Sequence, residues 1–171
     1  SVGIIANNPY HKAGALDADS CEKTTSFLVL CDSFNIPVIM LVDTPGFLIG
    51  KSGEYKKVTG KIMNWMNALS LVTVPVLTVI VRKNYGQAYL NMGAGKASDA
   101  IVAWPTSRIS FMDPRPAINV VYNLKKEDDP EKYEQLLAEM NKNTEPWQAA
   151  GTFGVNDIID PRKTREYLIN M

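Results

Sequence analysis

The stretch Pro37–Gly50, PVIMLVDTPGFLIG, decides the fold that we predict for this chain. Its apolar run stops at Asp43, and Pro45 and Gly46 then set the path of a loop. A second stretch, Pro75–Tyr89 (PVLTVIVRKNYGQAY), repeats the order of proline, apolar run, charged residue and glycine-containing loop. Continuous apolar runs are typical of parallel strands that are covered on both faces. Because ligands bind at the carboxyl ends of such strands, we expect the functional residues in these two loops.

Strand-like and helix-like patterns alternate on both sides of these two stretches. Apolar residues recur every three or four positions between Asp17 and Asn35, which is the helical period. We expect strands at 3–6, 37–43, 74–82, 100–104 and 108–112, and helices at 17–35, 54–71, 87–92, 116–124 and from 130 onward. Gly93–Lys96 should end the short helix 87–92, and the tail should hold a strand-like segment and a last helix. This order predicts an α/β fold with a mostly parallel sheet.

Length and composition bound the class of protein. The chain has 171 residues, enough for one domain with a core, and its 18 basic and 18 acidic residues cancel. A nucleic-acid surface needs a basic excess, and a membrane span needs roughly 20 apolar residues in a row, so we expect neither. The first residues already resemble a strand, so we expect no signal peptide and a chain cut from a longer one or starting at a domain boundary.

Cysteine and histidine usage gives little sign of a reactive side chain. Cys21 and Cys31 fall on one predicted helix, about 15 Å apart at ~1.5 Å per residue, which is too far for a disulfide. Free cysteines fit a reducing compartment. The single histidine, His11, lies in a polar loop, where we expect a solvated side chain and no metal cluster.

Three segments resemble nucleotide-binding motifs, but none of them completes such a motif. GFLIGKS, from Gly46 to Ser52, has three residues between its first glycine and GK, whereas a P-loop needs four. Asp43–Gly46 matches the DxxG of GTPases, yet no phosphate loop precedes it, and Gly93–Lys96 also lacks the full spacing. The chain has no GxSxG, no HExxH and no serine-histidine-aspartate set. We therefore expect any chemistry here to rest on backbone donors.

The turn Tyr85-Gly86-Gln87-Ala88 is the best candidate for such donors. A predicted strand ends here and a predicted helix begins, and the first amides of a helix have no partner within it. Such amides can bind an anion or an oxyanion. The alternative is an ordinary strand-to-helix turn with no function.

Several motifs in order resemble the carboxyltransferase subunits of biotin-dependent acyl-CoA carboxylases. They are GIIANNP, VDTPGFLIGKSGEY, TVIVRKNYGQAYLNM, DAIVAWPTSRISFMDPRPAINVVY and GVNDIIDPRKTR, and together they cover nearly the whole chain. The resemblance implies a crotonase-type fold of stacked β-β-α units. It also implies that residues 1–171 form a single C-terminal carboxyltransferase domain, without the N-terminal half that holds most of the coenzyme A site.

The resemblance implies transfer of a carboxyl group from carboxybiotin to the α-carbon of an acyl-CoA, with biotin as the base. The backbone amides of Gln87 and Ala88 would bind the ureido oxygen of biotin. Pro45, Gly46, Phe47, Tyr85 and Gly86 would wall the same pocket, and Leu90 would help to set the size of the acyl group. The implied partners are the N-terminal half of the same or a neighbouring subunit, a biotin carrier, a biotin carboxylase component and further copies of the chain, in the cytoplasm or the mitochondrial matrix.

Three departures from the family pattern leave the substrate open. Gln87 stands where the family has a second glycine, Leu90 where propionyl-type members carry an acid, and Asp113-Pro114-Arg115 where the family is rich in glycine and alanine. Gln87 keeps its amide, but its side chain can intrude, and the wider φ range of glycine is lost. Two alternatives remain: a decarboxylase that runs the reverse transfer, and a non-catalytic assembly module in which Gln87 blocks the pocket.

Overall fold

The computed structural model describes residues 1–95 and 97–171 and confirms the α/β class. Its parallel sheet has the strand order β1-β2-β3-β4-β6, and β5 pairs with the end of β3. The strands are β1 (Gly3–Ala6), β2 (Val38–Thr44), β3 (Val76–Tyr85), β4 (Ala100–Ala103), β5 (Arg108–Ser110) and β6 (Asp157–Ile158). The two stretches with a proline, an apolar run and a loop therefore form the neighbouring strands β2 and β3. Lys96, in the predicted break at 93–96, lies outside the described residues.

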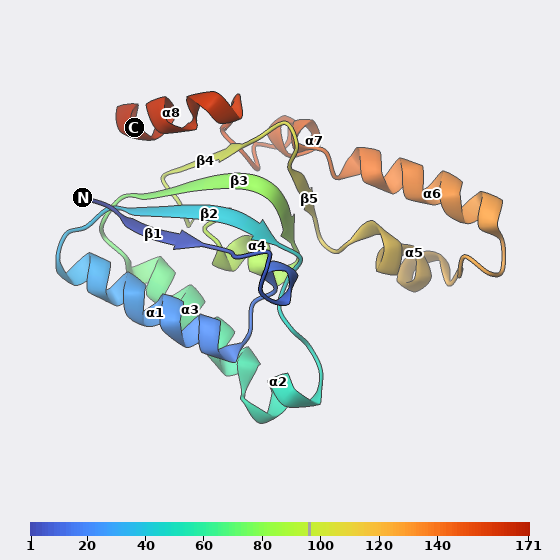
Figure 1. Cartoon of the computed structure of the whole chain (residues 1–171), viewed down its shortest axis with the longest axis horizontal. Helices are drawn as coiled ribbons and strands as arrows, with labels where there is room; N and C mark the ends of the chain where they lie inside the picture. Colours follow the sequence, from blue (N-terminus) through green and yellow to red (C-terminus); the bar gives the residue numbers. More distant parts are fainter. Residues whose placement is uncertain (96) are drawn as a thin grey trace.

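Two helices, α1 (Ala18–Ser33) and α3 (Val58–Leu71), pack against each other and cover one face of the sheet (Figure 1). Leu28 of α1 and Trp65 of α3 are both fully buried against Val38 and Met40 of β2. Cys21 and Cys31 lie on α1, both free and both buried, as the predicted helix required. This core layer makes the sheet a rigid base for the loops at its carboxyl edge.

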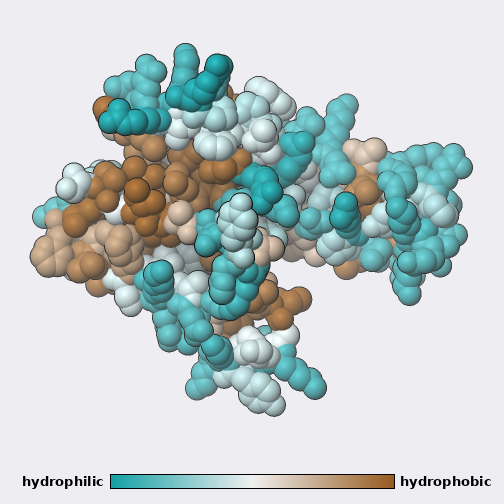
Figure 2. Space-filling view, viewed as in Figure 1, coloured by the Kyte–Doolittle hydropathy of each residue, from teal (hydrophilic) through white to brown (hydrophobic). Residues whose placement is uncertain are grey.

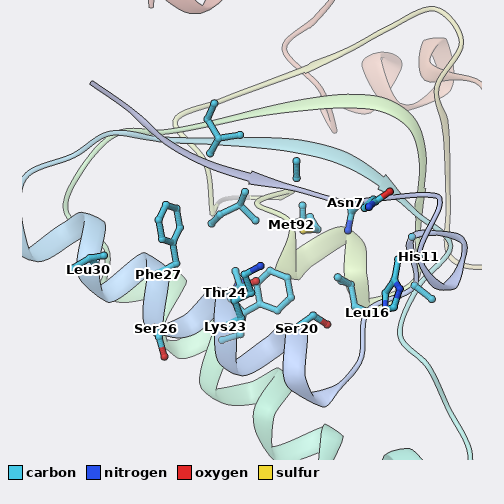
Figure 3. A pocket seen from close by; sticks show the side chains of 17 residues that line it. Asn7, His11, Leu16, Ser20, Lys23, Thr24, Ser26, Phe27, Leu30 and Met92 are labelled. Carbon is cyan, nitrogen blue, oxygen red and sulfur yellow. The ribbon is translucent and has the colours of Figure 1, made fainter.

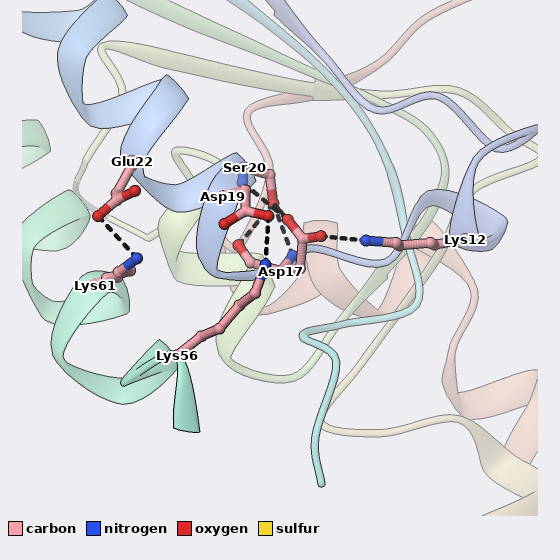
Figure 4. Close-up of polar contacts among 7 residues, drawn as sticks. All are labelled: Lys12, Asp17, Asp19, Ser20, Glu22, Lys56 and Lys61. Carbon is pink, nitrogen blue, oxygen red and sulfur yellow. Dashed lines mark hydrogen bonds and ion pairs between the residues drawn. The ribbon is translucent and has the colours of Figure 1, made fainter. Parts of the chain in front are cut away.

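The amino terminus of α1 is held by a capping box. The Asp17 carboxylate accepts a hydrogen bond from the Ser20 N–H at 2.9 Å, and the Ser20 hydroxyl oxygen accepts one from the Asp17 N–H at 2.7 Å. Asp17 also pairs with Lys12, in the short turn η1 (Lys12–Gly14), and Lys61 of α3 pairs with Glu22 of α1 at 2.8 Å (Figure 4). These contacts fix the start of α1 to the elements on both sides.

The single helix predicted at 54–71 is wrong, because the structure has two. A short helix, α2 (Lys51–Tyr55), is followed by Lys56 and Lys57 before α3 begins. Lys57 adopts a left-handed backbone conformation with φ 55°, which an α-helix cannot continue through. The apolar period of 54–71 is real but belongs to α3 alone, where Val58, Trp65 and Leu69 are buried.

The strands predicted at 100–104 and 108–112 are present as β4 and β5, and both pair with β3. β3 pairs with β4 from Leu77 to Ile80 and with β5 from Lys83 to Tyr85. The strand therefore changes its neighbour part-way along its length. After β3 the chain enters the short helix α4 (Gln87–Asn91), close to the predicted bounds.

The carboxyl-terminal third forms a helical arm and returns to the sheet. The arm holds α5 (Pro114–Tyr122) and α6 (Pro130–Asn143), which pack on each other and extend away from the sheet (Figure 1). α7 (Pro146–Gly151), which the sequence patterns did not predict, leads back to β6, and η2 (Pro161–Lys163) and α8 (Thr164–Asn170) complete the chain. Among the described residues, none of the helices combines the length and apolar character that crossing a bilayer requires.

Candidate functional site at the end of β3

A glycine turn joins β3 to α4 at the carboxyl edge of the sheet. Gly86 has φ 63° and ψ −145°, a conformation that residues with a side chain rarely adopt. Its N–H donates to the carbonyl of Ser110 at 3.0 Å, which extends the pairing of β3 with β5 by one bond. A Cβ at this position would lie 3.2 Å from the carbonyl oxygen of Phe111, so the turn needs glycine for its angles and for close approach.

The two amides that follow Gly86 are unpaired within the part of the chain that the structure describes. Neither the Gln87 N–H nor the Ala88 N–H has an acceptor there, whereas the next one, of Tyr89, donates to the Gly86 carbonyl at 3.1 Å. Ala88 is fully buried, so water does not satisfy its N–H. A buried N–H without an acceptor costs about 1–3 kcal/mol, and such groups call for a specific explanation.

The side chain of Gln87 folds back along α4. Its Nε2 lies 3.2 Å from Oδ1 of Asn91 and 2.9 Å from Sδ of Met66. Gln87 is the first residue of α4, and its φ is not in the positive range that favours glycine. Gln87 therefore adopts a conformation that needs no glycine, and its side-chain amide group is engaged with Met66 and Asn91.

A cleft of about 530 Å³ lies beside this turn. Gly86, Gln87 and Leu90 line it, together with residues of three other elements: Ile109 and Ser110 of β5, Asn143 of α6, and Gln148 and Ala149 of α7. Leu90 is 39 % exposed. Ala88 is not among the lining residues, so of the two unpaired amides only that of Gln87 belongs to a residue in the cleft wall.

The loop after β2 lies against the same turn without lining that cleft. Gly46 is placed so that a Cβ on it would be 3.8 Å from the carbonyl oxygen of Tyr85. The loop is fixed by hydrogen bonds with Leu16: the Leu16 N–H donates to the Gly46 carbonyl at 3.0 Å, and the Leu48 N–H donates to the Leu16 carbonyl at 2.7 Å. Phe47 packs edge-on against Trp65 with ring centroids 6.3 Å apart.

Of the remaining predicted site residues, Pro45 is half-buried and Tyr85 is only 4 % exposed. Burial raises the pKa of Tyr85, so its hydroxyl stays neutral. The structure thus brings Gly86, Gln87 and Leu90 to one cleft, and the other predicted pocket residues, Pro45, Gly46, Phe47 and Tyr85, do not line it.

A larger cavity, of about 730 Å³, lies between β1 and α1 and contains none of the predicted site residues (Figure 3). Phe27 and Leu30 of α1 line its long side, and Asn7 and His11 lie at its end near the carboxyl edge of the sheet. His11 is exposed, as the polar loop predicted. This cavity is predominantly apolar and is separate from the glycine turn.

Sequence reasoning missed the contribution of β5. The Ser110 carbonyl accepts a hydrogen bond from Gly86, and the Phe111 carbonyl lies close to the glycine turn. Nothing in the residue types of Ser110 and Phe111 signals these positions. It also missed the ion pair of Asp43 with Arg82, although both residues were noted as the charges that end the two apolar runs. Charges at the ends of neighbouring parallel strands are a usable signal for such a pair.

Comparisons with known proteins identify the family. The model of the carboxyl transferase domain matches residues 1–171. The chain belongs to this family. The carboxyltransferase subunit of propionyl-CoA carboxylase from Haloferax mediterranei is 41 % identical over 174 residues, covering 99 % of this chain and 34 % of that protein. Methylmalonyl-CoA decarboxylase subunit alpha from Propionigenium modestum is 39 % identical over 178 residues, covering 99 % and 34 %.

A solved structure extends the likeness to the fold. Transcarboxylase 12S, described as a hexamer and with methylmalonyl-coenzyme A and methylmalonic acid bound, superposes with a TM-score of 0.92 at 39 % identity, covering 99 % of this chain and 34 % of that one. The crotonase-type architecture of the carboxyl transferase family is thereby confirmed. The chain spans about a third of the length of the relatives that it matches.

Proposed function

We propose that this carboxyl transferase domain is the biotin-facing half of an acyl-CoA carboxyltransferase. The observation that carries the proposal is the pair of unpaired amides, of Gln87 and Ala88, at a strand-to-helix turn that requires glycine. Amides of this kind stabilise negative charge on an oxygen, and they do so with no side-chain base. This agrees with a chain whose motifs include no proton-transfer set.

The residues at the turn fit the carbonyl of biotin. When bound, biotin supplies the carboxyl group and the base for the α-carbon of the acyl-CoA. The Gln87 amide, which belongs to a residue of the cleft wall, would donate to its ureido oxygen, and the Ala88 amide is the next donor along the turn but is fully buried in this chain. Gly86, without a Cβ, lets the backbone run close to the Phe111 carbonyl. The turn would be supported on the side away from the cleft by Pro45, Gly46, Phe47 and Tyr85.

Leu90 would contact the acyl group, because it is part-exposed in the cleft wall one helical turn after Gln87. A leucine offers apolar contact and no charge, which favours an uncharged acyl chain. The acyl-CoA would complete its site on the N-terminal half of the same or a neighbouring subunit, with residues 1–171 as the C-terminal domain. A biotin carrier and a biotin carboxylase component would be the other partners, in a homo-oligomer.

The direction of transfer has two candidates. One relative is named a carboxylase subunit and another a decarboxylase subunit, at nearly equal identity. The same amides serve both directions, since they bind the oxygen of biotin before or after transfer. We propose the carboxylase direction first, and a reducing compartment, the cytoplasm or the mitochondrial matrix, because both cysteines are free.

The test compares a variant that loses the amide hydrogen and the side chain of Gln87 with one that loses the side chain alone. Gln87 is the first residue of α4, a position that tolerates proline, and its N–H has no acceptor to lose among the described residues. In the full-length protein, Gln87→Pro should lower kcat for carboxyl transfer by roughly 10²–10³-fold, the usual cost of one oxyanion donor. Gln87→Ala, which removes the side chain but keeps the N–H, should lose far less.

Equal activity of Gln87→Pro and the parent protein would refute the role of the amide. Assays with an acyl-CoA plus a carboxybiotin donor, and with a carboxylated acyl-CoA plus biotin, separate the two directions. The assembly-module alternative predicts no turnover in either assay and no binding of a biotin derivative. Circular dichroism and particle size of each variant show whether the fold and the assembly are intact.

A further inference from the structure

β3 contains a bulge at the point where it changes its neighbour. In the pairing with β2, Val42 lies opposite Ile80 and Thr44 lies opposite Asn84. One residue separates the first pair from the second on β2, whereas three separate them on β3, so β3 carries two extra residues. Before this point β3 pairs with β4, and after it β3 pairs with β5. Bulges re-aim a strand, and they are common beside active sites.

The single β2 residue opposite this bulge is Asp43, and its carboxylate contacts two residues of the bulge, Arg82 and Lys83. Oδ1 accepts hydrogen bonds from the Arg82 Nε at 3.1 Å and from the Lys83 N–H at 3.2 Å. Oδ2 accepts from the Arg82 Nε at 3.0 Å and lies 2.9 Å from its Nη2. The backbone N–H of Asp43 donates to Oδ1 of Asn7 at 3.0 Å, which ties in the end of β1.

The residues after the bulge lead directly to the glycine turn. Lys83, Asn84 and Tyr85 pair with β5, and the Gly86 N–H continues that pairing to Ser110. From Lys83 to Tyr85 the register with β5 is continuous, so the position of Gly86 and Gln87 follows from where the bulge places Lys83. A hydrogen bond to the Lys83 N–H therefore acts on the turn through a short, paired piece of strand.

We propose that Asp43 is a positioning residue, which holds the β3 bulge at Arg82 and Lys83 and so sets the position of the Gln87 and Ala88 amides. The ion pair is half-exposed, with 53 % of the Arg82 side chain accessible, so its stabilising effect on the whole fold is modest. The Asp43 contact matters because it lies next to the glycine turn. A small displacement of catalytic donors lowers the rate far more than it lowers the stability of the fold. The catalytic part of this inference rests on the proposed function.

Asp32 is a matched control within the same chain. Its carboxylate accepts hydrogen bonds from the backbone N–H groups of Thr73 and Val74 and from the Thr73 hydroxyl, at 2.7–3.2 Å. Asp43 accepts from one backbone N–H and from the Arg82 guanidinium. These residues lie just before β3, at the opposite edge of the sheet from the turn. Removing either carboxylate thus deletes a similar set of contacts, but only the Asp43 set adjoins the bulge.

The experiment compares Asp43→Ala, Asp43→Asn, Arg82→Ala and Asp32→Ala in the full-length protein. Asp43→Ala should lower kcat for carboxyl transfer by about 10–100-fold, as expected for misplaced donors, with the KM for acyl-CoA changed much less. Asp43→Asn should recover most of that loss, since its amide oxygen still accepts from the Lys83 N–H. Arg82→Ala should fall between the two, and Asp32→Ala should keep kcat while lowering the melting temperature.

Hydrogen exchange, followed by mass spectrometry, gives a readout that does not depend on turnover. The peptide covering residues 83–91 should exchange faster in Asp43→Ala and at the parent rate in Asp32→Ala, where the faster peptide should be 72–77. Unchanged exchange at 83–91 in Asp43→Ala, or equal kcat losses in Asp43→Ala and Asp32→Ala, would overturn the proposal. If Asp43→Ala does not fold, Asp43→Asn and Arg82→Ala carry the same comparison. A parent protein without transfer activity would refute the proposed function, and the exchange data would still decide whether Asp43 holds the bulge.

Discussion

Asp17 shows how one carboxylate can serve two contacts at a helix start. It caps α1 through the Ser20 N–H and pairs with Lys12 in the preceding turn. The hydrogen bond from Lys12 and those from Ser20 hold the pKa of Asp17 well below its ordinary value near 3.8. A carboxyl whose pKa is lower in the folded state stabilises the fold fully above its unfolded pKa, and this contribution is lost as the pH falls through the folded value.

Asp17→Asn should isolate this charge, because the asparagine oxygen still accepts from the Ser20 N–H. At pH 7 we expect the variant to be less stable by roughly 0.5–1 kcal/mol, the usual size of a part-exposed ion pair. The difference should shrink as the pH is lowered from 4 toward 2, because the carboxyl of the unfolded chain takes up a proton in this range while that of the folded protein stays ionised. Urea denaturation at several pH values measures it, and a difference that stays constant with pH would contradict the assignment.

At the scale of elements, the break between α2 and α3 depends on one strained residue. Lys57 has φ 55° with no side-chain cap, and it is exposed. A left-handed conformation costs a residue with a Cβ about 1–2 kcal/mol, a cost that glycine avoids. Lys57→Gly should therefore stabilise the protein by about 0.5–1 kcal/mol, after the extra chain entropy of glycine is counted.

Ala68→Gly is the control for that change, because Ala68 lies inside α3 with helical geometry. It should destabilise the protein by about 0.5–1 kcal/mol, the opposite sign to Lys57→Gly. Thermal unfolding of the two variants beside the parent distinguishes them. Two losses of the same sign would mean that the turn at Lys57 is unstrained or that the helices move independently of the core.

The elements that periodicity predicted are those whose burial follows a repeating pattern. β2 and α1 are of this kind, because their side chains alternate or recur against one continuous core. The break at Lys57 has no such pattern, since lysine is a good helix former and its left-handed conformation appears only in the structure. α7 was not predicted for a related reason, because six residues are too few to show a helical period.

The part of the candidate site that depends on a local strand-to-helix turn could be predicted from the sequence. The part that depends on contacts between residues far apart in the chain could not. Gly86 and the first residues of α4 follow from a strand running into a helix, so the turn could be found in the sequence. The contacts of Ser110 and Phe111 with that turn are non-local, and the bulge that Asp43 binds appears only in the register of two strands. The side-chain path of Gln87 depends on Met66, from a different helix.

At the scale of the whole molecule, β1 forms an edge of the sheet. Among the described residues β1 pairs with β2 alone, and apolar residues of α1 lie across the cavity from it. Figure 2 shows apolar residues gathered on this side of the molecule. The N–H groups of Gly3 and Asn7 point toward β2, so by alternation those of Ile4 and Ala6 point outward. An unpaired edge beside exposed apolar side chains is a template for pairing with another chain.

The polypeptide of residues 1–171, prepared alone, should therefore associate as its concentration rises. Ile4 is 56 % exposed on the open edge, and a lysine there would place a charge where a second strand would pair. We expect Ile4→Lys to shift association to at least several-fold higher concentration in sedimentation experiments, with unchanged circular dichroism. Tyr10→Lys is the control, because Tyr10 is fully exposed but lies in the loop beyond β1 and does not line the cavity between β1 and α1. If both variants shift the equilibrium equally, net charge and not the open edge governs association, and if neither does, the edge is protected by the fold itself.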